Sequence, residues 1–350
     1  MDYKEMIIDE NITVLQAMER LDALAISRKV LFITKDDILV AALSDGDIRR
    51  WILSQGDLRA PVNKVANFSP KYLSYSEKSK AMEYMKINDI QALPIVNNEK
   101  KIKNIILWDK NEVIADSEKI EAPVVMMAGG LGTRLYPYTK ILPKPLIPIG
   151  DIPIAEHIIN SFKKFGCKKF FLVVNHKKNM IKAYFNEIEK DYEIKYADED
   201  TPLGTGGGLS LLKGEIDKTF IFTNCDILIT EDISAIYRFH KKEKNIITMV
   251  CSLKNFQIPY GVVEIGKDGC IENMKEKPEL SFFTNTGCYI VEPEVIEHIK
   301  DNTFIGFPDI VEEYKNSGKK VGVYPISENS WFDMGQMDEL EKMRTELNLD

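Results

Sequence analysis

Residues 122–135 read APVVMMAGGLGTRL, an apolar run that turns into a glycine-rich loop. The run from Ala122 to Ala128 ends at glycine, which predicts a short buried strand followed by a tight turn. Gly129, Gly130 and Gly132 let the backbone turn sharply and approach an anion closely. The N–H groups of such a loop can point inward and hold phosphate oxygens. The stretch therefore predicts a strand that leads into a phosphate-binding loop.

Two cations accompany this loop. Arg134 offers a bidentate fork and Lys144, in the string PKPL, offers a point charge, and both suit phosphate. The Walker pattern requires Gly-Lys-Ser/Thr at its end, whereas Gly132 is followed by Thr133 and Arg134. The dinucleotide pattern G-x-G-x-x-G is also excluded, because Leu135 stands where the third glycine belongs. The loop is therefore a phosphate site of another kind.

Apolar runs typical of strands alternate with helical patterns from Val124 onward. This alternation predicts an α/β domain with a mostly parallel sheet and helices on both faces. Ligands of such folds lie at the carboxyl ends of the strands. Asp226 follows the predicted strand Thr219–Phe222, so we expect it to converge with the glycine-rich loop. The expected helices are 155–165, 180–189 and 232–242, and the other expected strands are 170–175, 246–253 and 288–291.

The string GGLGTRLYPYTKILPKPL, residues 129–146, resembles the signature of the sugar-1-phosphate nucleotidyltransferases. The resemblance covers roughly two-thirds of the chain and gives an expected catalytic domain over residues 120–350. It implies a Rossmann-like, GT-A-like fold. It also implies Mg²⁺-dependent transfer of a nucleoside monophosphate from a nucleoside triphosphate to a sugar 1-phosphate, with release of pyrophosphate.

The same resemblance implies a role for each candidate residue. Arg134, Lys144 and Asp226 would be catalytic, and Asp226 with Asp333, in the string WFDMG, would hold the metal. As a plain structural alternative, Asp226 would cap a helix and Asp333 would lie in a surface turn. The expected nucleotide-binding residues are Ala128, Gly129, Gly130, Gly132, Thr133, Gly204 and Thr205, and the expected sugar-phosphate-binding residues are Gly261, Glu276, Lys277 and Asn285.

Residues 1–119 carry a weak internal repeat of a helix followed by two strands, with a spacing of about 60 residues. The repeat resembles a pair of CBS modules, an α+β tandem that implies an adenosine nucleotide as ligand. Ser44 and Asp47 match the ribose-holding residues of that family. Leu107-Trp108-Asp109 occupies the equivalent place in the second copy and lacks the hydroxyl. Ser44 is equally explained as a helix N-cap. Residues 110–120 are expected to form a linker or a linking helix.

The composition of the chain favours a globular protein and argues against several other classes. With 350 residues, 44% hydrophobic and 29% charged, the chain is typical of a globular protein of about two domains. Its net charge of −8 argues against broad nucleic-acid binding. An acidic N-terminus and the lack of a long apolar run predict a cytoplasmic protein without a membrane partner. The five cysteines lack a C-x-x-C pair, so we expect neither disulfides nor zinc.

The motifs do not decide which nucleobase the donor carries or which sugar 1-phosphate is the acceptor. The domain combination resembles the guanylyltransferases that activate α-D-glucosamine 1-phosphate for bacterial legionaminic acid synthesis, which favours GTP as donor and GDP-glucosamine as product. The alternatives are mannose 1-phosphate with GTP, or glucose-type sugars with UTP, dTTP or CTP. A non-catalytic, nucleotide-sensing regulatory protein is the alternative from another class. A homo-oligomer formed through either domain is compatible with the sequence.

Overall fold

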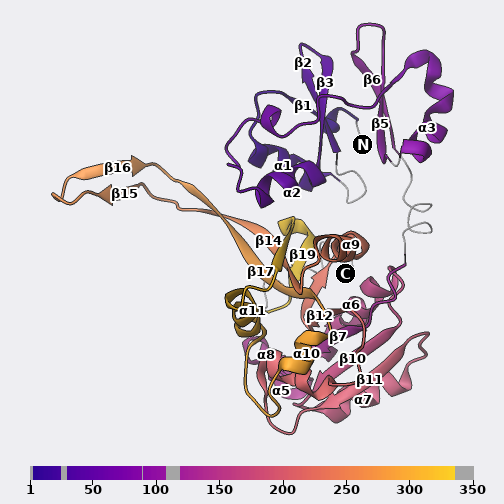
Figure 1. Ribbon diagram of the computed structural model, residues 1–350, viewed down its shortest axis with the longest axis vertical. Helices are drawn as coiled ribbons and strands as arrows, with labels where there is room; N and C mark the ends of the chain where they lie inside the picture. Colours follow the sequence, from indigo (N-terminus) through magenta and orange to yellow (C-terminus); the bar gives the residue numbers. More distant parts are fainter. Residues whose placement is uncertain (1–2, 25–29, 89, 108–118, 336–350) are drawn as a thin grey trace. The chain divides into compact units, whose positions relative to one another are not determined.

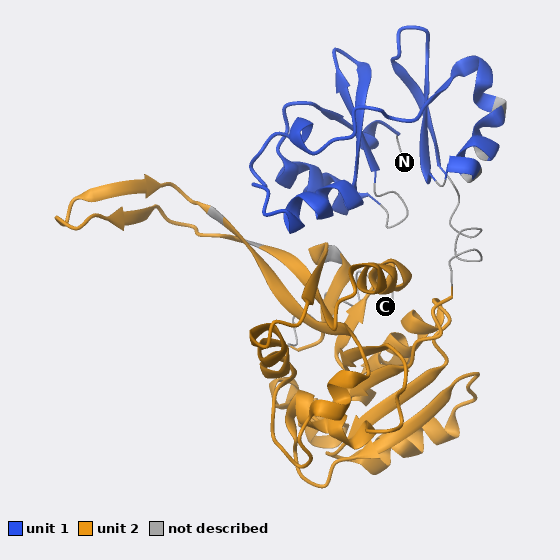
Figure 2. Cartoon of the chain, in the orientation of Figure 1, with its two compact units in different colours: residues 1–117 blue, residues 118–350 orange. Residues whose placement is uncertain are grey.

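The structure is a computed structural model that describes residues 3–24, 30–88, 90–107 and 119–335. The chain divides into two compact units, residues 1–117 and 118–350, which Figure 2 draws in separate colours. The buried apolar residues form separate clusters, and each cluster contains residues of one unit alone. Each unit is therefore organised around its own core.

The first unit contains one arrangement twice. In each copy a short strand lies parallel to the next strand, which is antiparallel to the third. The elements are β1 (Ile7–Asp9), α1 (Val14–Ala23), β2 (Val30–Lys35), β3 (Ile38–Ser44) and α2 (Asp45–Leu53), then β4 (Leu73–Ser74), α3 (Ala81–Asn88), β5 (Ala92–Val96) and β6 (Ile102–Leu107). The internal repeat that the spacing predicts is therefore visible in the fold. Trp108, Asp109 and most of the expected linker lie outside the described residues.

Capping explains where two helices of this unit begin. Thr13 and Gln16 form a capping box at α1, in which each side chain accepts a hydrogen bond from the other residue's backbone N–H. Ser44 and Asp47 form the same motif at α2. Such boxes satisfy backbone donors that the first turn of a helix leaves unpaired. Each cap typically stabilises the folded protein by about 1 kcal/mol.

The second unit is built on a seven-stranded sheet in the order β11-β10-β7-β12-β17-β14-β18 (Figure 1). Within this sheet every neighbouring pair is parallel except the two pairs that involve β17. The strands are β7 (Val124–Met127), β10 (Lys169–Val174), β11 (Glu193–Asp198), β12 (Phe220–Asn224), β14 (Ile247–Gln257), β17 (Glu279–Val291) and β18 (Val321–Ile326). The mostly parallel sheet expected from the alternating pattern is confirmed.

Side-chain alternation along the strands sends apolar residues to both faces of this sheet. Val124 and Met126 point into one core cluster, and Val125 and Met127 into the other. The first cluster includes residues of α6 (Ile154–Lys163), α7 (Lys178–Glu187) and α9 (Ile233–Glu243), and the second includes residues of α10 (Glu294–His298) and α11 (Phe307–Asn316). Burial on both faces explains why β7 reads as a continuous apolar run.

Two features of the second unit project from the central sheet. β13 (Ile227–Ile229) leaves the end of β12 and pairs with β19 (Trp331–Asp333). β14 and β17 continue beyond the sheet as a two-stranded ribbon that ends in the hairpin of β15 (Val262–Ile265) and β16 (Ile271–Lys275), which Figure 1 shows extending away from the body of the unit. No described helix is long and apolar enough to cross a membrane.

Candidate active site

The glycine-rich loop leaves β7 at the edge of the sheet where the parallel strands end. In the part of the chain that the structure describes, no backbone N–H from Gly129 to Gly132 donates a hydrogen bond to a protein acceptor. Gly130 is exposed and has open space where a side chain would stand. The loop therefore presents free backbone donors in the way that an anion-binding loop requires.

Gly132 determines how this loop returns to the sheet. Its φ of +64° lies in the left-handed region, which favours glycine. A methyl group on Gly132 would lie 2.9 Å from Cγ2 of Thr139 and 3.2 Å from Cβ of Lys144. The Thr139 hydroxyl donates a hydrogen bond of 2.7 Å to the Gly132 carbonyl. These contacts hold Lys144 directly beside the glycine-rich loop.

Lys144 and Asp226 form an ion pair at the end of β12. Both side chains are largely buried, with 12% and 10% of their surface exposed. Because a charge buried alone is costly, each group stabilises the other in this position. The loop after β7 and the loop after β12 are thereby joined at one point, as expected for ligand sites in open α/β sheets.

The short pairing of β13 with β19 brings Asp333 to the same point. Asp333 lies opposite Ile227, the residue after Asp226, and the Met334 N–H donates to the Asp226 carbonyl at 3.0 Å. Two carboxylates that are far apart in the sequence thus become neighbours. Neither Asp caps a helix or lies in an exposed surface turn.

The charges around Asp333 alter its titration. Burial and the negative charge of Asp226 raise the pKa of Asp333 above its ordinary value of 3.8. The Gly335 N–H, which donates to Oδ1 at 2.7 Å, and the cations Lys144 and Arg134 act in the opposite direction. A methyl group on Gly335 would lie 3.3 Å from a guanidinium nitrogen of Arg134. Arg134, Lys144, Asp226 and Asp333 therefore form one cluster, here called the charged cluster.

Glu199 is a candidate site residue that local sequence patterns do not indicate. It follows β11 and is only 6% exposed, and burial raises the pKa of its carboxyl group. Its Oε1 accepts a hydrogen bond of 3.4 Å from the Leu203 N–H. Methyl groups on Gly129 and Gly208 would lie 2.6 and 2.8 Å from its two carboxylate oxygens. Glycines on both sides thus leave a buried carboxylate next to the phosphate loop.

A second glycine-rich loop, residues 202–209, is packed against other parts of the second unit. α8 (Gly204–Gly207) lies against the segment before α11, where the Gly206 and Gly207 N–H groups donate to the Ile305 carbonyl at 2.9 and 3.1 Å. The Thr205 hydroxyl accepts from the Phe307 N–H at 3.0 Å. Gly204 and Thr205 are therefore engaged with the protein, and Gly208 contacts Glu199.

Three of the expected sugar-phosphate residues lie together and the fourth lies apart. A methyl group on Gly261 would lie 2.9 Å from Oε2 of Glu276, the sequence neighbour of Lys277. Asn285 lies on β17 beyond the end of β12, where it accepts from the Gly287 N–H at 3.0 Å. Gly261, Glu276 and Lys277 lie on the projecting ribbon. Within the described residues, no hydrogen bond or ion pair joins these three to the charged cluster. Their role in the sugar site therefore stays a prediction.

Ser44 and Asp47 of the first unit are engaged with each other. The Ser44 hydroxyl donates to Asp47 Oδ2 at 2.6 Å, in addition to the capping-box bonds at α2. Asp47 also forms an ion pair with Arg50. This arrangement accounts for both residues as a helix cap, and nucleotide binding by them stays a prediction.

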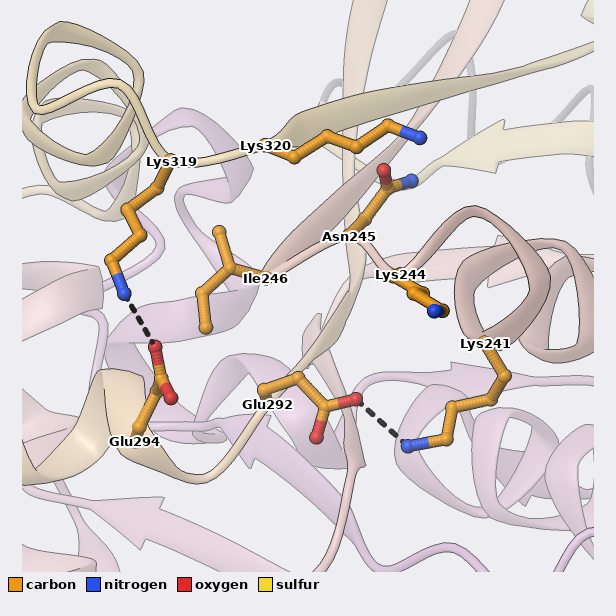
Figure 3. A pocket seen from close by; sticks show the side chains of 8 residues that line it. All are labelled: Lys241, Lys244, Asn245, Ile246, Glu292, Glu294, Lys319 and Lys320. Atoms are coloured by element: carbon orange, nitrogen blue, oxygen red, sulfur yellow. Dashed lines mark hydrogen bonds and ion pairs between the residues drawn. The ribbon is translucent and has the colours of Figure 1, made fainter.

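A hollow of about 370 Å³ lies at the opposite edge of the sheet, where β14 and β18 begin and β17 ends (Figure 3). Lys241 pairs with Glu292 at 2.9 Å, and Lys319 pairs with Glu294 at 3.4 Å. The residues that line this hollow are Lys241, Lys244, Asn245, Ile246, Glu292, Glu294, Lys319 and Lys320. Carboxylates of the chain partly neutralise these lysines, and the glycine-rich loop and Asp226 lie at the other edge. We therefore place the candidate active site at the charged cluster.

Residues 123–348 match the family model described as nucleotidyl transferase. The chain belongs to this family. Two relatives are the mannose-1-phosphate guanylyltransferase catalytic subunit beta of Drosophila pseudoobscura pseudoobscura, 32% identical over 50% of this chain and 49% of its own length, and the mannose-1-phosphate guanyltransferase of Pichia angusta, 33% identical over 61% and 60%. The chain thus spans about half to three fifths of the length of these relatives.

A solved structure of similar fold is that of HddC from Yersinia pseudotuberculosis, determined in a complex with GMP-PN. It aligns with a TM-score of 0.51 and 20% identity over 65% of this chain and 99% of that one. The family match and this alignment confirm the expected nucleotidyltransferase α/β fold. The CBS pair and the legionaminic acid specificity stay predictions.

Proposed function

We propose that this chain transfers a nucleoside monophosphate from a nucleoside triphosphate to a sugar 1-phosphate and releases pyrophosphate. The observation that carries the proposal is the charged cluster beside the free N–H groups of the glycine-rich loop. Two anions must approach each other in this reaction, so fixed cations and backbone donors are what the chemistry needs from a protein. Family membership and the two guanylyltransferase relatives support the same reaction class.

The position of each residue suggests its role in this reaction. The backbone of residues 129–133 and the guanidinium of Arg134 would hold the phosphate chain of the triphosphate. Lys144 would face the phosphoryl group that is transferred. An oxygen of the sugar phosphate attacks the α-phosphorus, the bond from that phosphorus to the bridging oxygen of the β-phosphate breaks, and pyrophosphate leaves. The chain therefore needs no nucleophilic side chain.

The donor set fits Mg²⁺. This ion typically binds one or two protein carboxylates and completes its shell with water and phosphate oxygens. Asp226 and Asp333 supply two carboxylates, and the described residues contain no larger cluster of acidic, His or Cys ligands that would form a closed protein cage. The mutual effect of these carboxylates, seen in the raised pKa of Asp333, favours a cation between them. When bound, Mg²⁺ would neutralise phosphate charge and orient the leaving group.

GTP is the donor that we favour, and Glu199 is the residue that supports this choice. Guanine carries N1–H and N2–H donors side by side, and a carboxylate offers two acceptors with matching spacing. Glu199 is buried, has no cationic partner among the described residues and lies beside Gly129 and Gly208. The two named guanylyltransferase relatives agree with this choice.

A hexose 1-phosphate is the acceptor that we propose, with Glu276, Lys277, Gly261 and Asn285 as the contacting residues. Glucosamine 1-phosphate, with GDP-glucosamine of the legionaminic acid route as product, is the first candidate because of the resemblance of the whole chain. Mannose 1-phosphate is the second candidate, and the names of the two relatives favour it. A cytoplasmic location is part of this proposal, because nucleoside triphosphates are found there.

The deciding experiment is pyrophosphate release with Mg²⁺, in which GTP, UTP, dTTP, CTP and ATP are crossed with the 1-phosphates of glucosamine, N-acetylglucosamine, mannose and glucose. We expect one strong GTP signal that Asp226→Asn abolishes. Asp191→Asn, which alters an exposed carboxylate paired with Lys163, is the matched control and should leave the rate unchanged. Silence of the folded wild-type protein across the whole grid would favour the non-catalytic regulatory alternative.

We also propose that the first unit is a CBS pair that binds an adenosine nucleotide. The repeated strand order and the Ser44–Asp47 spacing support this idea. Calorimetric titration with AMP, ADP and ATP tests it, with Ser44→Ala as the variant. If none of the three binds or changes the rate or thermal stability, the first unit has another role.

A further inference from the structure

The turn between β10 and α7 contacts the loop segment, here defined as residues 129–144, at two places. The His176 N–H donates to the carbonyl of the first residue of this segment at 3.4 Å. The Lys177 ammonium donates to the carbonyls of Thr139 and Lys140 at 3.0 and 2.5 Å. Two successive residues of one turn therefore contact the segment on both sides of the glycine-rich loop.

The carbonyls that Lys177 binds lie at the end of a short helix that cannot continue. α5 (Tyr138–Ile141) is a single turn, and a helical carbonyl ordinarily accepts from the N–H group four residues later. For Thr139 that residue is Pro143, which has no N–H. Thr139 is only 1% exposed, and an unpaired backbone carbonyl in such a place is costly. Lys177 supplies the donor that Pro143 cannot.

The backbone position of Lys177 is unfavourable for a lysine on local grounds. Its φ of +52° lies in the left-handed region, which is uncommon for a residue other than glycine. It is also the N-cap of α7, where Ser, Thr, Asp and Asn are preferred and positive charge is unfavourable. Its side chain makes no capping hydrogen bond. The lysine is therefore explained by the carbonyls that its ammonium holds, and strain kept for such a purpose is typical of functional sites.

A chain of contacts leads from Lys177 to the charged cluster. Thr139, whose carbonyl accepts from Lys177, uses its hydroxyl to donate to the Gly132 carbonyl at 2.7 Å. A methyl group on Gly132 would lie 3.2 Å from Cβ of Lys144, so these two residues are packed together. Lys144 in turn pairs with Asp226. Among the described residues, Lys177 itself has no hydrogen bond or ion pair with the charged cluster, so any effect on it passes through the loop segment.

We propose that Lys177 is a positioning residue for the nucleoside triphosphate, an inference that rests on the proposed function. Backbone donors bind an anion well only when they are already held in place, because ordering a loop at the moment of binding costs conformational entropy. By fixing α5, Lys177 holds the loop segment in the one arrangement in which its N–H groups and Lys144 face the phosphates. Lys177 does not touch the triphosphate.

The kinetic test uses Lys177→Met, which keeps the length of the side chain and removes its donors. The KM for the triphosphate should rise about 10- to 100-fold, the usual cost of losing a hydrogen bond from a charged donor. The KM for the sugar phosphate should change less than about 3-fold. Lys177→Arg restores N–H donors and should return the KM for the triphosphate to within about 5-fold of the wild type.

Lys178→Met is the matched control, since it removes the same charge one residue further on. The Lys178 ammonium lies 3.6 Å from a carboxylate oxygen of Asp198 and does not contact the loop segment in the described structure. Its loss should change both KM values less than about 2-fold. An equal rise with Lys178→Met would overturn the proposal, because the effect would then come from charge alone. A fall in kcat with both KM values unchanged would also overturn it.

Hydrogen–deuterium exchange of the nucleotide-free full chain gives a readout that does not depend on activity. The amides of residues 133–142 should exchange about 10-fold faster in Lys177→Met than in the wild type, and those of β10 should be unchanged. Lys178→Met should match the wild type throughout. Unaltered exchange of residues 133–142 in Lys177→Met would overturn the proposal. If the exchange changes as expected but the wild type transfers no nucleotide, the clamp stands and the proposed function fails.

Discussion

At the scale of single residues, the charged cluster places the carboxylate of Asp333 where folding alone does not favour it. Burial and Asp226 raise the pKa of Asp333, so the folded chain holds a proton there more tightly than the unfolded chain does. The contribution of this group to folding is present at low pH and is lost as the pH rises through the raised pKa. At neutral pH the ionised Asp333 is therefore a cost to stability that serves the site.

We predict that Asp333→Asn abolishes nucleotidyl transfer and also stabilises the protein. The amide keeps an acceptor for the Gly335 N–H and removes the charge beside Asp226. The free energy of unfolding at pH 7.5 should rise by roughly 0.5–1 kcal/mol, as is common when functional charges are removed. Chemical denaturation measures this change. The gain should vanish below pH 3.8, where the carboxyl of the wild type is protonated in both states; a variant less stable at pH 7.5 would contradict the argument.

We predict that Glu199→Gln lowers kcat/KM for GTP about 100-fold, because the new amide NH₂ would face a donor of guanine. The side chains have nearly the same shape, so the melting temperature should change little. ITP, which lacks the exocyclic amine, provides a second test. The wild type should use ITP less well than GTP, and the variant should narrow that difference. If both enzymes treat the two nucleotides alike, Glu199 does not read the base.

At the scale of secondary structure elements, glycines serve two opposite purposes. Gly207 in α8 is buried, and a methyl group on it would lie 2.2 Å from the Thr303 carbonyl oxygen. Gly130 in the glycine-rich loop is exposed, and a methyl group on it would meet nothing within 4 Å. The first glycine permits two backbones to pack, and the second leaves open space beside the loop.

We predict that Gly207→Ala lowers the free energy of unfolding by about 2–3 kcal/mol, since the added methyl overlaps backbone. Gly130→Ala should change it by less than about 0.5 kcal/mol and instead raise KM for the nucleotide. Urea unfolding and steady-state kinetics of the two variants test this contrast. A destabilised Gly130→Ala protein with normal KM would show that the loop is structural.

Elements that carry a local sequence signal can be predicted from the sequence. The expected strands and helices of the second unit are present because each carries a local signal, such as the buried run of β7 or Asp232, whose carboxylate caps α9. The pairing of β13 with β19 has no such signal, since each strand is three residues long. For this reason, resemblance is the only sequence basis for the expectation that Asp333 holds the metal.

The position of Glu199 and the course of the projecting ribbon could not be predicted from the sequence for a related reason. The burial of Glu199 depends on Gly129 and Gly208, which are distant in sequence and meet it only when the sheet is assembled. The strings around Gly261 and Glu276 predicted a place near the sugar. That role stays a prediction. The pairing of β14 with β17 and of β15 with β16 places these strings on the projecting ribbon, and local patterns do not reveal its direction.

At the scale of the whole molecule, the two units have separate cores, so their stabilities should be separable. We predict two calorimetric transitions. Leu43→Ala, in the core of the first unit, should lower one of them, and Leu172→Ala, in the second unit, should lower the other. Each loss should be about 2–5 kcal/mol, as is usual for a fully buried leucine. A single transition that both variants shift equally would show that the units unfold together.

The place of β17 in the sheet also bears on how the chain is made. β17 lies between β12 and β14, yet it is synthesised after both of them. Until residue 291 has left the ribosome, one edge of β12 and one edge of β14 lack the neighbour that separates them in the finished sheet, and β18 comes later still. Unpaired edges of this kind are where growing chains associate wrongly. The nascent second unit is therefore exposed to aggregation over a long stretch of translation, and we expect its yield in cells to depend on the elongation rate and on chaperones that shield strand edges.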